Sequence, residues 1–171
     1  MDEVISYREA TVEDVATICE LGQLLNAIHH AERPDIYAAE TLDYTRDAPH
    51  WMSFLDNPEQ VIFLAFVGDR PAGFVSAGMF SAGGPLMQPM AFARIGSVCV
   101  VQVFWGKGLG RGLIRHVQAW ALERSAQDIR LSVWGFNTHA RRLYEELGFE
   151  TRAYEMGMRL KRRSSHASAL L

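Results

Sequence analysis

The stretch from Ile95 to Leu113 constrains the fold of this chain more than any other. It starts as a β-branched apolar run that is typical of a buried strand, and it continues into glycines at alternate positions before an apolar-periodic helix. Glycine lets a backbone approach an anion closely, and the free first-turn N–H groups of a helix favour negative charge. The stretch therefore predicts a strand, a turn and a helix that together hold a phosphate group.

The spacing of these glycines separates the known classes of phosphate loop. A P-loop needs Gly-x-x-x-x-Gly-Lys-Ser/Thr, which is absent from the sequence, and this disfavours nucleotide hydrolysis. The dinucleotide fingerprint Gly-x-Gly-x-x-Gly is not met either, because no glycine stands three residues after Gly108. What remains is Val98-x-Val100 followed by the run 106–110, Gly-Lys-Gly-Leu-Gly.

A second motif follows a strand-like run at 129–133. It consists of Asn137, Ala140, Tyr144 and the pair Gly148-Phe149. With the glycine stretch, it resembles the GCN5-related N-acetyltransferase superfamily, whose acyl-coenzyme A-binding segment and later Asn, Ala, Tyr and Gly-Phe motif occur in this order. The two motifs cover roughly the last half of the chain, although Trp105 stands where the family usually has Arg or Gln.

The resemblance implies acetyl-coenzyme A as the cofactor and suggests which residues hold it. We expect main-chain contacts to the pantetheine arm from Val98 and Val100, and one of their N–H groups to face the developing oxyanion. The remaining expected cofactor contacts are pyrophosphate binding by Gly106, Gly108, Gly110 and Arg111, a point charge from Lys107 or Arg111, and a hydrogen bond from Asn137. Tyr144 is expected to protonate the departing thiolate, as the catalytic residue.

Each of these residues also has a purely structural interpretation. The glycines suit a tight turn before a packed helix, and Asn137 suits a helix N-cap. Tyr144 suits a packed core aromatic.

The general base is not identified by the resemblance. Many family members have a Glu two residues before the position of Val98, whereas this chain has Gly96 there. The amine either arrives neutral or loses its proton through water to a residue of the 29–51 segment, which is expected to form the substrate-side wall. The candidates in that segment are Glu32, Asp35, His29 and His30.

Charge and cysteine content exclude several classes of function. With 17 basic and 20 acidic residues the net charge is −3, so we expect no nucleic-acid partner and no attraction to an anionic membrane. Cys19 and Cys99 are interpreted as buried small hydrophobic residues. Free cysteines of this kind indicate a protein of the reducing cytoplasm, and neither is expected to act as the nucleophile of an acyl-enzyme mechanism.

The adjacent His29 and His30 lack the i, i+4 spacing of a helical zinc site, so no metal is expected. No leader or long apolar span is evident.

The order of the expected elements predicts an α/β fold with a mixed, mainly antiparallel sheet of six to seven strands and helices on both faces. The expected strands are 4–8, 60–67, 72–79, 92–103, 129–134 and 151–160, and the expected helices are 15–28, 38–44, 48–55, 109–121 and 137–147. Residues 81–89 are expected to form a flexible loop. We expect one acyl-coenzyme A N-acyltransferase domain over 1–160 and a mobile tail over 161–171.

The expected function is transfer of an acetyl group from acetyl-coenzyme A to a primary amine of a small molecule or peptide, by direct attack in a ternary complex. A catalytically weak acyl-coenzyme A-binding or sensing module is the alternative, because the strand carboxylate is missing at Gly96. A nucleotide-binding protein of another kind is a third possibility. We expect a homodimer, the commonest closed oligomer.

Overall fold

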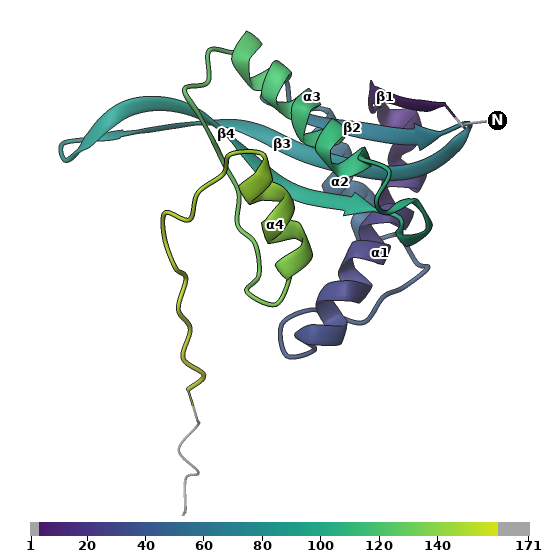
Figure 1. The fold of residues 1–171 in the computed structure, drawn as a ribbon. Coiled ribbons are helices and arrows are strands. Elements are labelled where there is room, and N and C mark those ends of the chain that lie inside the picture. The colour runs from purple at the N-terminus through teal and green to yellow at the C-terminus, as the bar shows by residue number, and fades with distance from the viewer. Residues whose placement is uncertain (1–3, 161–171) are drawn as a thin grey trace, which may run out of the picture.

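The structure is a computed structural model that describes residues 4–160 (Figure 1). Its strands are β1 (Ile5–Glu9), β2 (Gln60–Val67), β3 (Arg70–Gly84), β4 (Met87–Val100) and β5 (Asp128–Arg130). Its α-helices are α1 (Val15–Glu32), α2 (Asp47–Leu55), α3 (Leu109–Glu123) and α4 (Thr138–Glu146). Within the described residues, single turns of 3-10 helix also occur at Val12–Asp14 and Gln102–Phe104.

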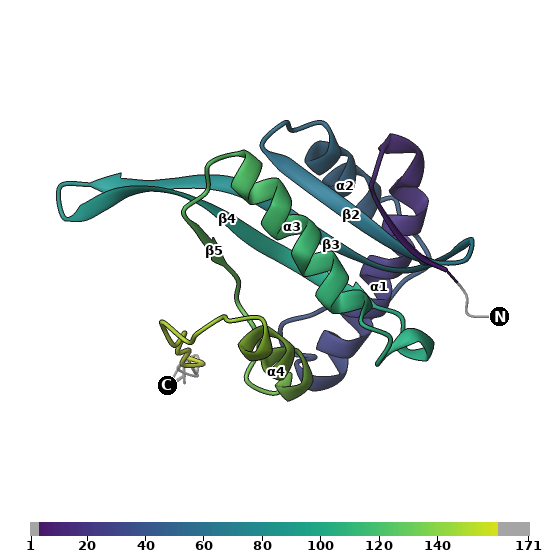
Figure 2. The same ribbon diagram turned by 45° about the horizontal axis from the view of Figure 1, so that its top comes forward.

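The strands form a single mixed sheet in the order β1-β2-β3-β4-β5. The first four are antiparallel to their neighbours, and β5 runs parallel to β4. In Figure 2, α3 lies across one face of this sheet and α1 and α2 lie behind the other. This confirms the predicted fold class of a mixed, mainly antiparallel sheet with helices on both faces, although the sheet of the described residues has five strands where six to seven were expected.

The continuous apolar run of β2 is explained by burial on both faces of the sheet. Val61, Phe63 and Ala65 pack into the core under α3, while Ile62 and Leu64 pack into the core under α1 and α2. A strand covered on one side only would alternate apolar and polar residues. The sheet is therefore the middle layer of three, and both cores depend on it.

The structure corrects three sequence predictions. Residues 151–160 form no strand, because an extended segment becomes a strand only when it pairs, and no described strand lies against it. Residues 38–44 are irregular rather than helical. The predicted loop at 81–89 is mostly strand, because β3 and β4 continue past the body of the molecule as a hairpin with Ala82 opposite Met90.

The other predicted helices and the hairpin at 60–79 are confirmed. The strand predicted at 129–134 is shorter, since only β5 pairs with β4. The tail predicted to be mobile, 161–171, lies outside the described residues. No helix of the described chain is both long and apolar enough to cross a bilayer.

Candidate functional site

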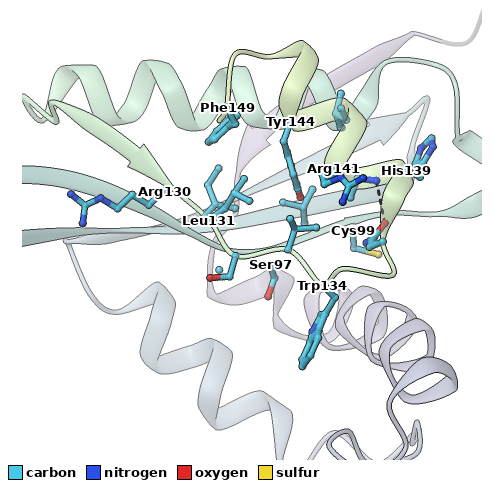
Figure 3. A pocket seen from close by; sticks show the side chains of 18 of the residues that line it. Ser97, Cys99, Arg130, Leu131, Trp134, His139, Arg141, Tyr144 and Phe149 are labelled. Carbon is cyan, nitrogen blue, oxygen red and sulfur yellow. Dashed lines mark hydrogen bonds between the residues drawn. The ribbon is translucent and has the colours of Figure 1, made fainter. Parts of the chain in front are cut away.

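The candidate site is an open groove where β4 and β5 separate. The two strands pair only from Phe92 opposite Asp128 to Arg94 opposite Arg130. Beyond Arg94 they diverge, and α4 lies over the opening (Figure 3). The groove has a volume of about 2850 Å³, several times the roughly 300–1,000 Å³ of a typical small-molecule pocket. It has room for a long ligand and a second reactant.

A bulge in β4 lies at the start of this divergence. Ser76 of β3 is opposite Ser97 and Ala77 is opposite Ile95, which leaves Gly96 as the extra residue of β4. The Ser76 side chain is only 2% exposed, and its Oγ accepts a hydrogen bond from the Ser97 N–H at 3.0 Å. Bulges bend a strand and re-aim the residues that follow. Ser76 thus holds the bend through a buried hydroxyl.

The bulge sets the direction of the main-chain groups that follow it. The Ser97 N–H points to β3, and the Val101 N–H also points to β3, donating to the Ala72 carbonyl at 2.9 Å. Main-chain groups alternate sides along a strand, so those of Val98 and Val100 point the other way, into the groove. No strand of residues 4–160 pairs with this side of β4 beyond Arg94. The two residues predicted to bind pantetheine therefore present an open strand edge.

The glycine turn lies at one end of the groove. Gly106 and Gly108 have φ of +77° and +82°, in the left-handed region that side chains disfavour. Gly108 is the N-cap of α3, and no side chain caps this helix N-terminus. The first-turn N–H groups of α3 are consequently available to an anion. Lys107 belongs to the same turn but does not line the groove, and its Nζ lies 5.6 Å from the centre of the Phe104 ring.

Two of the residues that were predicted to bind pyrophosphate, Gly110 and Arg111, also connect α3 to α4. A Cβ atom at Gly110 would lie 3.1 Å from Leu143 Cδ2, so glycine here permits close packing of the two helices. Arg111 Nη2 forms an ion pair with Glu146 Oε2 at 2.6 Å. Both residues line the groove, and both help to position its α4 wall.

Trp105, which departs from the family pattern, spans the same end of the groove. Its Nε1 donates to the Val100 carbonyl at 2.7 Å, and its ring stacks on His139 with the ring centres 5.5 Å apart. Trp105 therefore joins the end of β4 to the N-terminal turn of α4. The Val100 carbonyl is used within the chain, which leaves the Val100 N–H for a ligand.

The polar residues of the second motif, Asn137 and Tyr144, belong to α4 and its N-cap. Asn137 is the N-cap of this helix, and its Oδ1 accepts a hydrogen bond from the Ala140 N–H at 3.1 Å. Tyr144 points from α4 into the groove in Figure 3, and its ring packs edge-on against Phe149 with 5.8 Å between ring centres. Tyr144 is 9% exposed, and this burial raises the pKa of its hydroxyl to about 12. The phenol therefore keeps its proton at neutral pH.

A cluster of four aromatic rings lies beside the groove, and three of them, His29, Tyr37 and Trp134, line it. Figure 3 shows Trp134 on the opposite side of the strands from Tyr144. His29 contacts Tyr37 and Phe136, with ring centres 4.7 and 6.2 Å apart. Trp134 contacts the same two rings, each at 6.0 Å, and its Nε1 donates to the Tyr37 hydroxyl at 2.8 Å. The four rings thus close a cycle between the end of α1 and the segment after β5. Trp134 and Phe136 were not predicted from the sequence as part of the site. Two aromatic residues so close together at the end of a predicted strand could have indicated them.

Only two of the four candidate bases line the groove, His29 and Asp35. Asp35 forms ion pairs with Arg33 at 2.8 Å and Arg159 at 2.5 Å, and hydrogen bonds from Arg33 hold the pKa of its carboxyl at about 2. Burial lowers the pKa of His29 below its ordinary value, so its imidazole is neutral at pH 7. His29 is therefore the better placed proton acceptor.

Other chemistries find little support among the described residues. Between residues 4 and 160 there is no group of three or more His, Cys, Asp or Glu side chains that could hold a metal ion. Cys19 and Cys99 are free and buried, and burial raises the pKa of the Cys99 thiol to about 12. A neutral thiol is a poor nucleophile.

Comparison with known proteins agrees with this geometry. A family model described as "Acetyltransferase (GNAT) family" matches residues 23–149. No curated protein matches the chain significantly. Among solved structures, a mutant of the BH1408 protein from Bacillus halodurans is 23% identical with a TM-score of 0.83, and the match covers 91% of this chain and 99% of that one.

Two further structures share the fold at lower identity. AAC(6')-Iy, in complex with the bisubstrate analogue CoA-S-monomethyl-acetylneamine, is 16% identical with a TM-score of 0.72, covering 92% of this chain and 99% of that one. The second is the aminoglycoside acetyltransferase meta-AAC0020 from an uncultured soil metagenomic sample, in complex with trehalose, which is 15% identical to this chain. Its TM-score is 0.70, and the match covers 92% of this chain and 97% of that one.

Proposed function

Because the chain belongs to the GNAT acetyltransferase family, we propose that it transfers an acetyl group from acetyl-coenzyme A to a primary amine of a small molecule or peptide. The observation that carries this proposal is the open edge of β4, where the main-chain groups of Val98 and Val100 point into the groove. This edge leads from the Gly108 turn toward Tyr144 on α4. An extended chain carrying amides and a pyrophosphate fits such an edge.

The residues present suit that cofactor at both of its ends. The N–H groups of Gly106, Gly108, Gly110 and Arg111 and the ammonium of Lys107 would hold the pyrophosphate. The Val98 and Val100 main chains would pair with the pantetheine amides, and Asn137 has an amide N–H₂ left to donate. When bound, acetyl-coenzyme A supplies an acetyl group activated as a thioester.

The chain's own residues then supply donors and a proton acceptor. The groove-facing N–H of Val98 is placed to stabilise negative charge on the carbonyl oxygen, and a comparable donor is worth about 2.7–4 kcal/mol in other enzymes. Tyr144 holds a proton on its hydroxyl and can give it to the leaving sulfur. His29 can take a proton from the incoming amine, directly or through water.

The side of the groove where we expect the acceptor amine to bind is lined by aromatic rings. The Asp35 carboxylate on this side is already paired with Arg33 and Arg159. Aminoglycosides belong in the first panel of amines to be tested, since one solved structure with a similar fold is an aminoglycoside acetyltransferase.

Free, buried cysteines fit the reducing cytoplasm, which we propose as the compartment. We also propose that the protein is a homodimer.

A catalytically weak acyl-coenzyme A-binding module is the second candidate, favoured by the glycine at position 96. Calorimetry with coenzyme A, ATP and NAD, followed by detection of free thiol from acetyl-coenzyme A with an amine panel, separates the candidates. We expect coenzyme A to bind tightest and thiol release to depend on an amine. Tight binding without amine-dependent release would favour the binding module, and tighter binding of ATP or NAD would contradict both.

A further inference from the structure

One side of the groove, which we call the α1-facing side, is formed partly by alternate residues of β4 and of the chain after β5. Their neighbours in sequence pack into the core under α3, namely Ala93, Ile95, Leu131 and Val133. Alternate side chains of a strand point to opposite faces, so Arg94 faces α1. Its Nη2 donates to Ser132 Oγ at 2.9 Å, and Trp134 lies on the side away from Tyr144 in Figure 3. This is the side on which we expect the acceptor amine.

Two groove-lining carboxylates on this side, Asp35 and Asp128, are each paired with two arginines. Asp35 pairs with Arg33 at 2.8 Å and with Arg159 at 2.5 Å. Asp128 of β5 pairs with two further arginines at 2.9 and 2.6 Å. Glu155 also lines the groove, but it lies on the projecting segment 151–160 and is exposed to solvent. A cationic ligand would therefore have to displace an arginine to reach either aspartate.

Arg94 differs from these arginines, because its partner is a neutral hydroxyl. No carboxylate among residues 4–160 forms an ion pair with it. Its exposed side chain lines the groove where β4 and β5 begin to separate. A guanidinium can bind a carboxylate through two parallel N–H···O hydrogen bonds. Arg94 is thus available to a carboxylate that a ligand brings into the groove.

Aromatic surface lines the same side next to Arg94. Trp134 is two residues after Ser132, and its ring centre lies 6.0 Å from those of Tyr37 and Phe136. The Arg33 guanidinium lies 5.0 Å from the centre of the Trp134 ring, so the chain itself already supplies the cation that this ring attracts. The rings therefore suit a flat apolar group better than a second ammonium group.

We propose that the acceptor is a small amine that also carries a carboxylate, with an aromatic or apolar body between its two charged groups. Arg94 binds the carboxylate, the rings of Trp134 and Tyr37 hold the body, and the amino group lies toward the Val98 N–H. Arg94 and Val98 lie opposite residues of β3 that are three positions apart, roughly 10 Å, so the two charged groups are several bonds apart. This inference rests on the proposed acetyltransferase function and names its acceptor class.

Three benzylamines that differ only at the para position test the acceptor class. The compound para-(aminomethyl)benzoate carries a carboxylate there, para-methylbenzylamine a neutral methyl group, and para-xylylenediamine a second ammonium. With acetyl-coenzyme A, kcat/KM from thiol release should fall in that order, by about tenfold from the first to the second. An aminoglycoside, as a polycation, should also be poorer than the benzoate. A preference for the diamine or the aminoglycoside over the benzoate would overturn the proposal.

Substitution of Arg94 tests the site of carboxylate binding. Arg94→Gln keeps a donor for Ser132 but removes the charge, so the ratio of kcat/KM for the benzoate to that for methylbenzylamine should fall from about tenfold to about one. Arg94→Glu should reverse the order of the benzoate and the diamine. The matched control is Arg115→Gln, since Arg115 is an exposed arginine of α3 that does not line the groove. A wild-type ratio in Arg94→Gln, or a lost ratio in Arg115→Gln, would contradict the assignment.

Calorimetry of the same amines with the coenzyme A complex keeps this inference separate from acetyl transfer. If the benzoate binds tightest and Arg94→Gln removes the difference while no amine releases thiol, the ligand preference of the groove stands and acetyl transfer fails. If thiol is released without preference for the carboxylate, acetyl transfer stands and this inference fails. Equal binding of all three benzylamines would overturn the inference whatever the turnover.

Discussion

The buried hydroxyl of Ser76 accepts a hydrogen bond from the Ser97 N–H at 3.0 Å, where β4 has one residue more than β3. This contact orients the residues after it, so that the Val98 N–H faces the groove. Replacing the hydroxyl should therefore affect both the stability of the sheet and the binding of coenzyme A.

Ser76→Ala leaves the Ser97 N–H without its acceptor inside the sheet. We expect a loss of about 1–3 kcal/mol in the free energy of unfolding and a several-fold weaker affinity for coenzyme A. Urea unfolding and calorimetry measure the two effects. The matched control is Ser81→Ala, which removes an exposed hydroxyl from the same strand and should change neither quantity. Wild-type coenzyme A affinity in Ser76→Ala would show that the hydroxyl does not position the groove.

Gly108→Val tests the anion site at the start of α3. Valine disfavours a φ of +82°, and its side chain would stand beside the first-turn N–H groups of the helix. We expect a folded variant with severely weakened coenzyme A binding in calorimetry. Gly110→Val is less informative, because its side chain would meet Leu143 of α4.

The control for Gly108→Val is Gly68→Val. Gly68 also has a positive φ, +59°, and open space around its Cβ position, but it lies in the turn between β2 and β3. It should show a similar backbone cost of roughly 1–2 kcal/mol with unchanged coenzyme A affinity. Equal affinity in both folded variants would remove the phosphate assignment.

Tyr144→Phe separates proton delivery from packing. The phenyl ring keeps the contact with Phe149, so stability and coenzyme A affinity should change little. The value of kcat should fall by roughly 10²- to 10⁴-fold if the hydroxyl protonates the leaving sulfur. Tyr144→Ala should in addition lose about 3–5 kcal/mol of stability through a cavity. A Phe variant with wild-type turnover, measured where chemistry limits the rate, would assign Tyr144 to the core alone.

The pH dependence of kcat/KM tests His29 as the proton acceptor. Burial disfavours its charged form, so its pKa lies below the usual 6.5 and the free base is present at neutral pH. We expect kcat/KM to be level near pH 7 and to fall on acidification with a midpoint below 6.5. The same shift makes the folded state less stable as the pH falls below 6.5, because the unfolded chain binds the proton more readily.

His29→Gln should lower kcat/KM and remove this acid limb. His30→Gln is the control: this neighbouring ring contacts the Tyr37 carbonyl at 2.7 Å but does not line the groove. It should keep the wild-type profile. An unchanged acid limb in His29→Gln would place the proton acceptor elsewhere.

The sequence alone determined the elements that depend on near neighbours along the chain. The helical spacing of Val15, Ile18 and Leu21 predicted α1, and the glycines at 106–110 predicted a tight turn before α3. The structure adds that Gly106 and Gly108 have positive φ there. Asn137 was predicted as an N-cap and is one. These features succeed because capping, turn geometry and amphipathic periodicity are set within a few residues.

The tertiary structure alone decided which surfaces are open. Residues 151–160 were predicted as a strand from their sequence, but a strand also needs a neighbour, and no described strand supplies one. The groove-facing Val98 N–H depends on the bulge at Gly96, and the wall of His29 and Trp134 joins residues far apart in sequence. Periodicity states which side chains share a face, whereas pairing and burial depend on contacts between distant segments, and these exist only once the chain has folded.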